Sequence, residues 1–337
     1  MIAPGSFRPV CEYTEDQLRL AARLYYGDGL AQMEVARLVK VSQAKVSRLL
    51  AAARKQGIVR ITVAPYDPRC GDLERRLKNA LGLETAIVIK TVDGLPPADC
   101  ARAIAHFAGP QVAALIPPLS VVAIAGGRTM HELVHHLPEQ RDRHITVVQA
   151  MGSIDSNVGP VDASELGRVL AARFGGYFLT LNTPAFVPDK RTRDSFLELP
   201  QIQSVKRHLA RATVALIGIG TLGNSLFLDR GVISREHCDR LAARGAVGEI
   251  CGRFFDRLGR ECDSPWRDRV LSIELDQLRR VPQVIGAVAG TDRSAALAAA
   301  IRGGLLNTLI IDEAGALALL EADIQSPAKL KNGTNRK

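Results

Sequence analysis

The spacing of apolar residues predicts three short helices near the start of the chain. Apolar side chains recur three or four positions apart over 15–27, 32–39 and 43–56. Thr14 and Ser42 stand where helix N-caps are expected, and Gly57 stands where the third helix would end. A tight turn at Lys40 and Val41 joins the second and third helices, which predicts a helix-turn-helix. We then expect a strand over 58–63, IVRITV, because its β-branched residues alternate with polar ones.

The predicted helices have distinct inner and outer faces. In the second helix we expect Val35, Ala36 and Leu38 to turn inward. In the third, an inward set of Val41, Val46, Leu49 and Leu50 leaves an outward set of Ser42, Gln43, Ala44, Lys45, Ser47 and Arg48. The N-terminal end of a recognition helix enters the major groove, where such side chains bond base edges and phosphates. The outward set is therefore a candidate DNA-reading surface; a three-helix interaction domain with a solvated basic face is the alternative.

From residue 65 on, apolar strands alternate with amphipathic helices. The strand candidates are 85–90, 120–126, 145–151, 176–181, 213–220, 284–290 and 308–313, and the helix candidates are 71–81, 98–116, 129–137, 163–174, 204–212 and 294–304. Near-continuous apolar strands separated by helices predict a parallel sheet covered on both faces. The expected fold is thus α/β, with a helix-turn-helix domain over 1–64 and a larger parallel-sheet domain over 65–323.

Charge is distributed unevenly between the two predicted domains. The 337 residues carry a net charge of +9. Residues 1–64 hold ten Lys and Arg against five Asp and Glu, whereas 65–323 hold thirty of each. The segment 324–337 adds four cations and no acid, which predicts a flexible basic tail. A basic head on a neutral body suits a polyanion-binding unit joined to a unit with another task, although solubility alone also favours basic residues.

Other features of the composition limit the function. The six cysteines form no C-x-x-C pair, so we expect reduced thiols, no metal site and no cofactor. The longest uncharged apolar run, 112–127, is short and contains Pro117 and Pro118, so we expect no membrane segment. The first residues lack an apolar signal-peptide core, and we expect a cytoplasmic protein.

Small and polar residues follow the predicted strands. They are Gly126–Thr129, Met151–Ser153, Asn182–Pro184, Gly218–Thr221 and Gly290–Arg293. Ligands of parallel sheets bind at the carboxyl ends of strands, and glycine N–H groups beside a helix N-terminus attract anions. These loops together predict a site for a phosphorylated or polyhydroxylated small molecule, whereas each glycine alone is explained more readily by a tight strand-to-helix turn.

The sequence resembles the SorC family of bacterial sugar-responsive transcriptional regulators. The resemblance lies in LYYGDGLAQMEVARLVKVSQAKVSRLLAAARKQGIVRITV, and continues in LIGIGTL, VGEICGRFFDRLGR and RGGLLNTLIIDEAGALALL, so that it covers about residues 14–322. It implies an effector domain similar to sugar-phosphate isomerases and deaminases, and a homodimer or homotetramer. It also implies a regulator of a carbohydrate-utilisation operon, whose affinity for double-stranded operator DNA depends on a sugar, polyol or sugar phosphate.

The resemblance also implies roles for individual residues. Gly127, Arg128 and Thr129 would hold the phosphate or another polar end of the effector, Gly152 and Ser153 would line the pocket, and Glu249 would accept hydrogen bonds from sugar hydroxyls. With Gly126 and Arg293 these residues form the predicted effector site. Arg293 stands where many relatives carry a lysine. Ala31 replaces the Thr or Ser that often caps the second helix, which costs about 1 kcal/mol of local stability.

Two enzymatic alternatives have sequence support. Gly218-x-Gly220-x-x-Gly223 matches the dinucleotide fingerprint, but 224–228 does not read as the required helix and no strand ending in an acid follows. A sugar-phosphate isomerase or deaminase with a DNA-binding head would need a base and a proton relay. Glu249, Asp155 and His131 are available for these roles, but their spacing does not assemble them. We therefore expect no catalytic residues; the sequence leaves open the effector, the operator and the direction of regulation.

Overall fold

The computed structural model describes residues 13–92 and 94–324. It divides into two compact units, Met1–Asp67 and Pro68–Lys337. The predicted basic tail lies outside the described residues from residue 325 onward.

The first unit is a small helical bundle. Its elements are α1 (Glu15–Ala22), the π-helical turn η1 (Arg23–Gly27), α2 (Gln32–Val39) and α3 (Gln43–Lys55). Leu18, Val35, Val46 and Leu49 form its core and are almost fully buried. Lys40 adopts a left-handed conformation (φ 53°) in the turn between α2 and α3, which completes a helix-turn-helix.

Two local predictions for this unit are wrong. Residues 58–63 form no strand: Ile61 and Val63 are 57% and 81% exposed, and the described residues give this segment no strand partner to complete a ladder. Leu38 points to solvent rather than inward, because it lies about 200° around the helix from Ala36, which faces the core.

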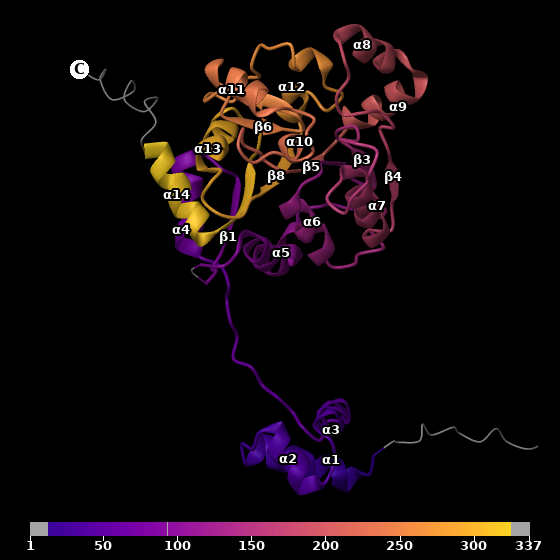
Figure 1. The fold of residues 1–337 in the computed structure, drawn as a ribbon, viewed down its shortest axis with the longest axis vertical. Helices are drawn as coiled ribbons and strands as arrows, with labels where there is room; N and C mark the ends of the chain where they lie inside the picture. The colour runs from indigo at the N-terminus through magenta and orange to yellow at the C-terminus, as the bar shows by residue number, and fades with distance from the viewer. Residues whose placement is uncertain (1–12, 93, 325–337) are drawn as a thin grey trace, which may run out of the picture. The chain divides into compact units, whose positions relative to one another are not determined.

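The second unit is built on a seven-stranded, fully parallel sheet (Figure 1). Its strands are β1 (Thr85–Ile89), β2 (Val121–Ile124), β3 (Thr146–Gln149), β4 (Tyr177–Leu179), β5 (Val214–Ile217), β8 (Gln283–Ala287) and β9 (Thr308–Asp312). They are ordered β1-β9-β8-β5-β2-β3-β4, in the register Val122↔Val147 and Val122↔Val214 on the two sides of β2. The predicted parallel sheet is thus confirmed.

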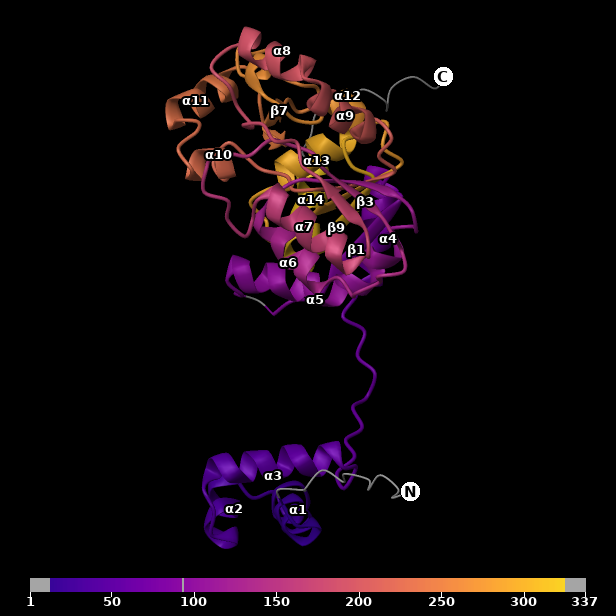
Figure 2. The same ribbon diagram turned by 90° about the vertical axis from the view of Figure 1, so that its right-hand side faces the viewer.

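Helices cover both faces of the sheet (Figure 2). One face packs against α5 (Pro97–Ala114), α6 (Arg128–His136) and α7 (Ala163–Arg173), and the other against α4 (Gly71–Leu81), α9 (Pro200–Leu209), α13 (Ser294–Arg302) and α14 (Glu313–Ile324). Because the strands are apolar on both sides, each face forms its own hydrophobic cluster.

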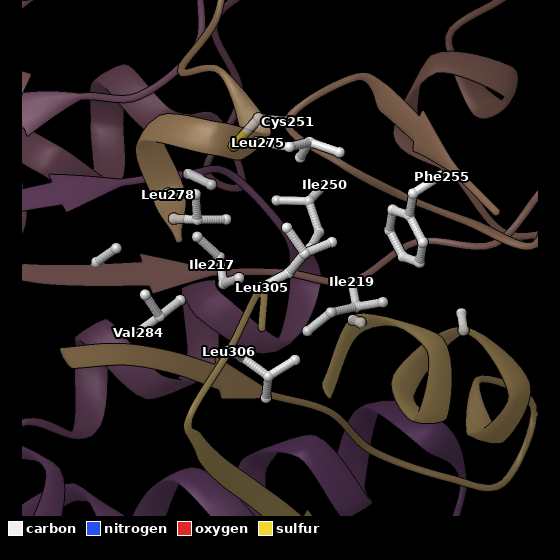
Figure 3. Packing of buried hydrophobic residues seen from close by; sticks show 14 of the residues in the cluster. Ile217, Ile219, Ile250, Cys251, Phe255, Leu275, Leu278, Val284, Leu305 and Leu306 are labelled. Carbon is white, nitrogen blue, oxygen red and sulfur yellow. The ribbon is translucent and has the colours of Figure 1, made fainter. Parts of the chain in front are cut away.

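A further layer lies between β5 and β8 in the sequence. It contains α10 (Leu226–Asp229), α11 (Arg235–Ala243), the hairpin β6 (Gly248–Ile250) and β7 (Arg253–Phe255), η2 (Arg267–Arg269) and α12 (Leu275–Leu278); α8 (Lys190–Glu198) precedes α9. Figure 3 shows Ile250 and Phe255 of the hairpin packed with Ile217, the last residue of β5, and with Ile219 in the loop that follows. The one-turn helix α10 corrects the expectation that 224–228 is not helical, because Ser225 caps it by accepting a hydrogen bond from Phe227 N.

The strand order places a switch point between β2 and β5. From β2 the chain proceeds outward through β3 to β4, then returns to the other side of β2 as β5 and proceeds outward through β8. The loops that leave β2 and β5 therefore diverge, and such a divergence opens a crevice at the carboxyl ends of the strands.

Candidate functional site

A hollow of about 700 Å³, partly open to solvent, lies at the carboxyl ends of β2 and β5, and we call it the switch-point cleft. Six of the eight predicted effector residues line it: Gly126, Gly127, Arg128, Thr129, Glu249 and Arg293. Other lining residues come from the loop after β5 and from the hairpin, and include Asn224, Ser225, Phe227, Cys251 and Gly252.

Two glycines at the cleft leave no room for a side chain. A Cβ on Gly126 would lie 2.7 Å from Val161 O, and a Cβ on Gly220 would lie 2.3 Å from Glu249 Oε1. Gly127 precedes α6 as its N-cap with φ 146°, a conformation that favours glycine. These glycines therefore have a steric role, in line with the tight strand-to-helix turns that the sequence suggests. They also expose the α6 N-terminus to the cleft.

Two arginines bring positive charge into the cleft. Arg128 begins α6 and is half exposed, whereas Arg293 precedes α13 and is largely buried. Burial lowers the pKa of Arg293, the Asp292 carboxylate opposes that shift, and the charge of Arg128 lowers the pKa further. The two guanidinium groups thus repel one another across a site framed by two helix N-termini, and an anion bound between them would relieve that repulsion.

A polar network holds these arginines in place. Arg128 Nη1 lies 2.7 Å from Asp229 Oδ2, and Arg128 also donates to Asn224 Oδ1. Asn224 Nδ2 donates to Asp292 Oδ2 over 2.9 Å, and Arg293 Nη1 donates to Asp292 Oδ1 over 2.9 Å. The network therefore connects α6, the loop before α10 and the start of α13 across the mouth of the cleft.

Glu249 is the buried acid of the cleft. Only 8% of its surface is exposed; its Oε2 accepts from Gly252 N over 2.9 Å, and its Oε1 accepts from Ser225 Oγ over 3.4 Å. Burial raises the pKa of Glu249, while these two hydrogen bonds lower it in part. A ligand hydroxyl donating to this carboxylate would stabilise its charged form. Burial and the Glu249 charge also raise the pKa of Cys251 to about 12, so this thiol is not a nucleophile at neutral pH.

Gly152 and Ser153 lie beside the cleft rather than in its lining. Ser153 N donates to Thr183 O over 2.8 Å, and a Cβ on Gly152 would lie 2.5 Å from Pro184 O. The neighbouring Met151 and Ile154 line the cleft instead. In this structure the two predicted residues fix the loop after β3 against the loop after β4.

The predicted DNA-reading surface forms one side of α3. Ser42, Gln43, Ala44, Ser47 and Arg48 are exposed, and Lys45 is half-buried with its Nζ 5.9 Å from the Tyr13 ring centre. Ser42 Oγ caps α3 by accepting a hydrogen bond from Lys45 N over 3.2 Å. The residues that anchor α3, Val46, Leu49 and Leu50, lie on its opposite side. At α2, where Ala31 offers no side-chain cap, the Glu34 carboxylate still accepts from Ala31 N over 3.0 Å.

Several residues of the candidate site are not predicted from the sequence. Asn224, Ser225 and Asp229 shape the cleft through side-chain contacts to residues more than twenty positions away. Asn224 and Thr221 close a small loop by exchanging backbone hydrogen bonds, and the helix that follows has only four residues. The dinucleotide fingerprint at 218–223 therefore lacks the long helix that would bind a pyrophosphate. The sequence signal for the short helix α10 is Ser225, a common N-cap residue, followed by three apolar residues, Leu226–Leu228.

The described ranges hold neither a metal-binding cluster nor a bilayer-spanning helix. Over residues 13–92 and 94–324, no cluster of three His, Cys, Asp or Glu side chains could hold a metal ion. The five cysteines in these ranges are free thiols, and Cys11 lies outside them. None of the helices that the structure describes is long and apolar enough to span a bilayer.

A helix-turn-helix unit joined to an α/β unit with a cationic ligand cleft defines a ligand-responsive regulator of transcription. Comparison with known proteins specifies the family. Residues 68–321 match the family model of a sugar-binding domain, Sugar-bind. The chain belongs to the SorC family of sugar-binding transcriptional regulators.

Individual relatives are similar over nearly their whole length. The sorbitol operon regulator of Klebsiella pneumoniae is 28% identical over 91% of this chain and 99% of its own. Its full-length crystal structure superposes with a TM-score of 0.74 and covers 92% of this chain. The deoxyribonucleoside regulator of Bacillus subtilis is 27% identical over 89% of this chain and 96% of its own. These relatives are named as regulators of transcription rather than as enzymes.

Proposed function

We propose that this protein regulates a carbohydrate-utilisation operon by binding operator DNA through α3, under the control of a sugar, polyol or sugar phosphate in the switch-point cleft. One observation carries the proposal: Arg128, Arg293 and the buried Glu249 line a single cleft. Two cations at helix N-termini suit a phosphate, and a buried carboxylate suits hydroxyl groups. A sugar phosphate carries both kinds of group.

The DNA-binding half of the proposal rests on α3. Gln43 and Lys45 would bond base edges, and Ser42, Ser47 and Arg48 would contact phosphates. Units of this kind act in symmetric pairs, so we propose a homodimer or homotetramer and an operator with two related half-sites. The relatives' names as regulators support DNA as a partner, and binding to operator DNA would place the protein in the cytoplasm.

Control by the ligand would act through the polar network at the cleft mouth. A phosphate on Arg128 competes with Asp229 and Asn224 for the same guanidinium group. Binding would therefore change how α6 is held against α10, and the protein would respond to the extent that the ligand binds one arrangement more tightly than the other.

Retained catalysis is the less favoured function. Glu249 already accepts hydrogen bonds from Gly252 and Ser225, and burial keeps its carboxyl group protonated to higher pH. Asp155 pairs with Arg230 at 3.1 Å, and His131 Nδ1 lies 2.9 Å from Pro160 O, so neither forms a relay with Glu249. We propose that the protein senses its ligand without turnover; incubation with sugar phosphates followed by product analysis tests this.

The experiment for the proposed function has two stages. A thermal-shift screen of sugars, polyols and their phosphates first identifies the effector, because a ligand bound to the native state raises the Tm. DNA binding is then measured with and without that effector for the wild type, Arg128→Ala and the control Arg168→Ala, an exposed arginine on α7. We expect Arg128→Ala to bind DNA but lose the response, and Arg168→Ala to keep both. A normal response in Arg128→Ala would show that the cleft is not the effector site.

A further inference from the structure

We propose that this protein has a second anion-binding site, which takes a small phosphorylated metabolite and lies outside the switch-point cleft. It is a hollow of about 720 Å³, partly open to solvent, between α11 and the segment 264–269; we call it the Trp266 pocket. It shares no lining residue with the cleft. Binding of an anion in the Trp266 pocket would not depend on the function proposed above.

The charge of the Trp266 pocket has one sign. Arg240, Arg244 and Arg269 line it together with His237 and, among the residues that the structure describes, no carboxylate does. Three guanidinium groups around one hollow repel one another and offer many N–H donors, which is the arrangement that phosphate recognition uses.

The three arginines of the pocket use few of their N–H donors in contacts within the protein. Arg244 Nη1 donates to Asp263 O over 2.9 Å, and Arg269 Nε donates to Val187 O over 2.9 Å, so both use backbone carbonyls that carry no net charge. Arg240 pairs with Glu236 at 2.7 Å, but both side chains are more than half exposed, and such a pair is weak. A dianionic phosphate would therefore meet little competition from the protein's own acids.

A buried hydroxyl gives a second, independent indication of a polar ligand. Ser264 lines the pocket, its exposed fraction is 8%, and its Oγ has no hydrogen-bond partner among the described residues. A buried polar group without a partner destabilises a fold, so its presence calls for an explanation. After a rotation of the buried Ser264 side chain toward the hollow, a phosphate oxygen in the pocket would provide the missing partner.

The floor of the pocket suits the organic part of the ligand and connects with the cleft. Leu241 and Trp266 supply apolar surface. Trp266 Nε1 also donates to Gly252 O over 2.7 Å, and its ring contacts Phe227 edge-on at 5.8 Å between centres. Gly252 and Phe227 both line the switch-point cleft, so a ligand that shifts Trp266 would alter the cleft wall.

Trp266 is the sole tryptophan of the sequence, so its fluorescence reports directly on this pocket. The experiment titrates the full-length protein with inorganic phosphate and with pyrophosphate at constant ionic strength. Four variants accompany the wild type: the double variant Arg240→Gln/Arg244→Gln, Ser264→Ala, the same-helix control Arg235→Gln, and Arg128→Ala in the cleft.

We expect a saturable fluorescence change that persists in Arg235→Gln and Arg128→Ala. The double variant should bind at least about tenfold more weakly, because charge-assisted hydrogen bonds are lost. Ser264→Ala should bind about two- to tenfold more weakly while keeping or raising its Tm without ligand, since it removes an unpartnered hydroxyl.

Two results would overturn this second site. One is the absence of saturable binding by either anion. The other is binding that Arg128→Ala abolishes and the double variant leaves unchanged, which would assign all anion binding to the cleft. Neither result bears on DNA binding by α3, so failure of this inference is distinguishable from failure of the proposed function.

Discussion

Substitution Glu249→Gln tests the electrostatics of the cleft. Burial raises the pKa of Glu249 above its ordinary value of about 4.5. The contribution of this carboxyl group to stability is therefore fully present below the unfolded pKa and is lost as pH rises through the folded pKa. Glutamine carries no charge, and its amide can still accept from Gly252 N and donate to Ser225 Oγ. The variant should gain stability relative to the wild type at neutral and alkaline pH.

The size of the gain follows from the raised pKa. Each unit by which burial raises the pKa of Glu249 corresponds to about 1.4 kcal/mol, once the pH exceeds the folded pKa. For a domain of this size, that is a rise in Tm of roughly 3–6 °C per unit. The gain should vanish near pH 4, where both states of the wild type are largely protonated.

Thermal unfolding from pH 4 to pH 9, followed by circular dichroism, measures the effect of Glu249→Gln. Glu84→Gln, at an exposed position outside the cleft, is the control and should show no pH-dependent gain. A Tm difference for Glu249→Gln that stays constant over this range, or becomes negative at high pH, would refute the assignment of a raised pKa to Glu249.

Three further substitutions test separate parts of the account. Arg48→Ala should weaken operator binding and reduce the slope of log affinity against log salt by about 1, measured by fluorescence anisotropy, with an unchanged circular dichroism spectrum. Ser42→Ala should lower the stability of the first unit by about 1 kcal/mol in denaturant titrations, whereas Ser47→Ala should not. Gly220→Ala should lower the Tm and weaken effector binding, because overpacking costs about 1–3 kcal/mol; Gly223→Ala, with open space around its Cβ, should change neither.

Much of the fold could be predicted because its signals are local. The seven sheet strands are short apolar runs between helices, and each predicted run overlaps a parallel strand of the structure. The segment 58–63 has the same kind of local signal but no strand partner among the described residues, so it forms no strand. Helix α11 was missed because it is mostly polar and buries only Cys238 and Leu241.

The site was predictable to the extent that strand ends determine it. Arg128 and Arg293 follow predicted strands, so a parallel sheet brings both to the carboxyl ends of its strands. Glu249 follows no strand of the sheet, and only the family resemblance indicated it. Asn224 and the three-arginine pocket at Trp266 depend on tertiary contacts between distant segments. Gly152 follows β3 as predicted, but it packs against the backbone of Pro184 and does not line the cleft.

The most direct test of the central claim is an anisotropy titration of full-length protein against DNA from upstream of its own gene. It is done at several salt concentrations, with and without the effector found by thermal shift. The account predicts binding that weakens steeply with salt and an effector-dependent change in affinity of about 5- to 150-fold. Absence of binding at low salt, or an affinity that no Tm-raising ligand alters, would contradict it.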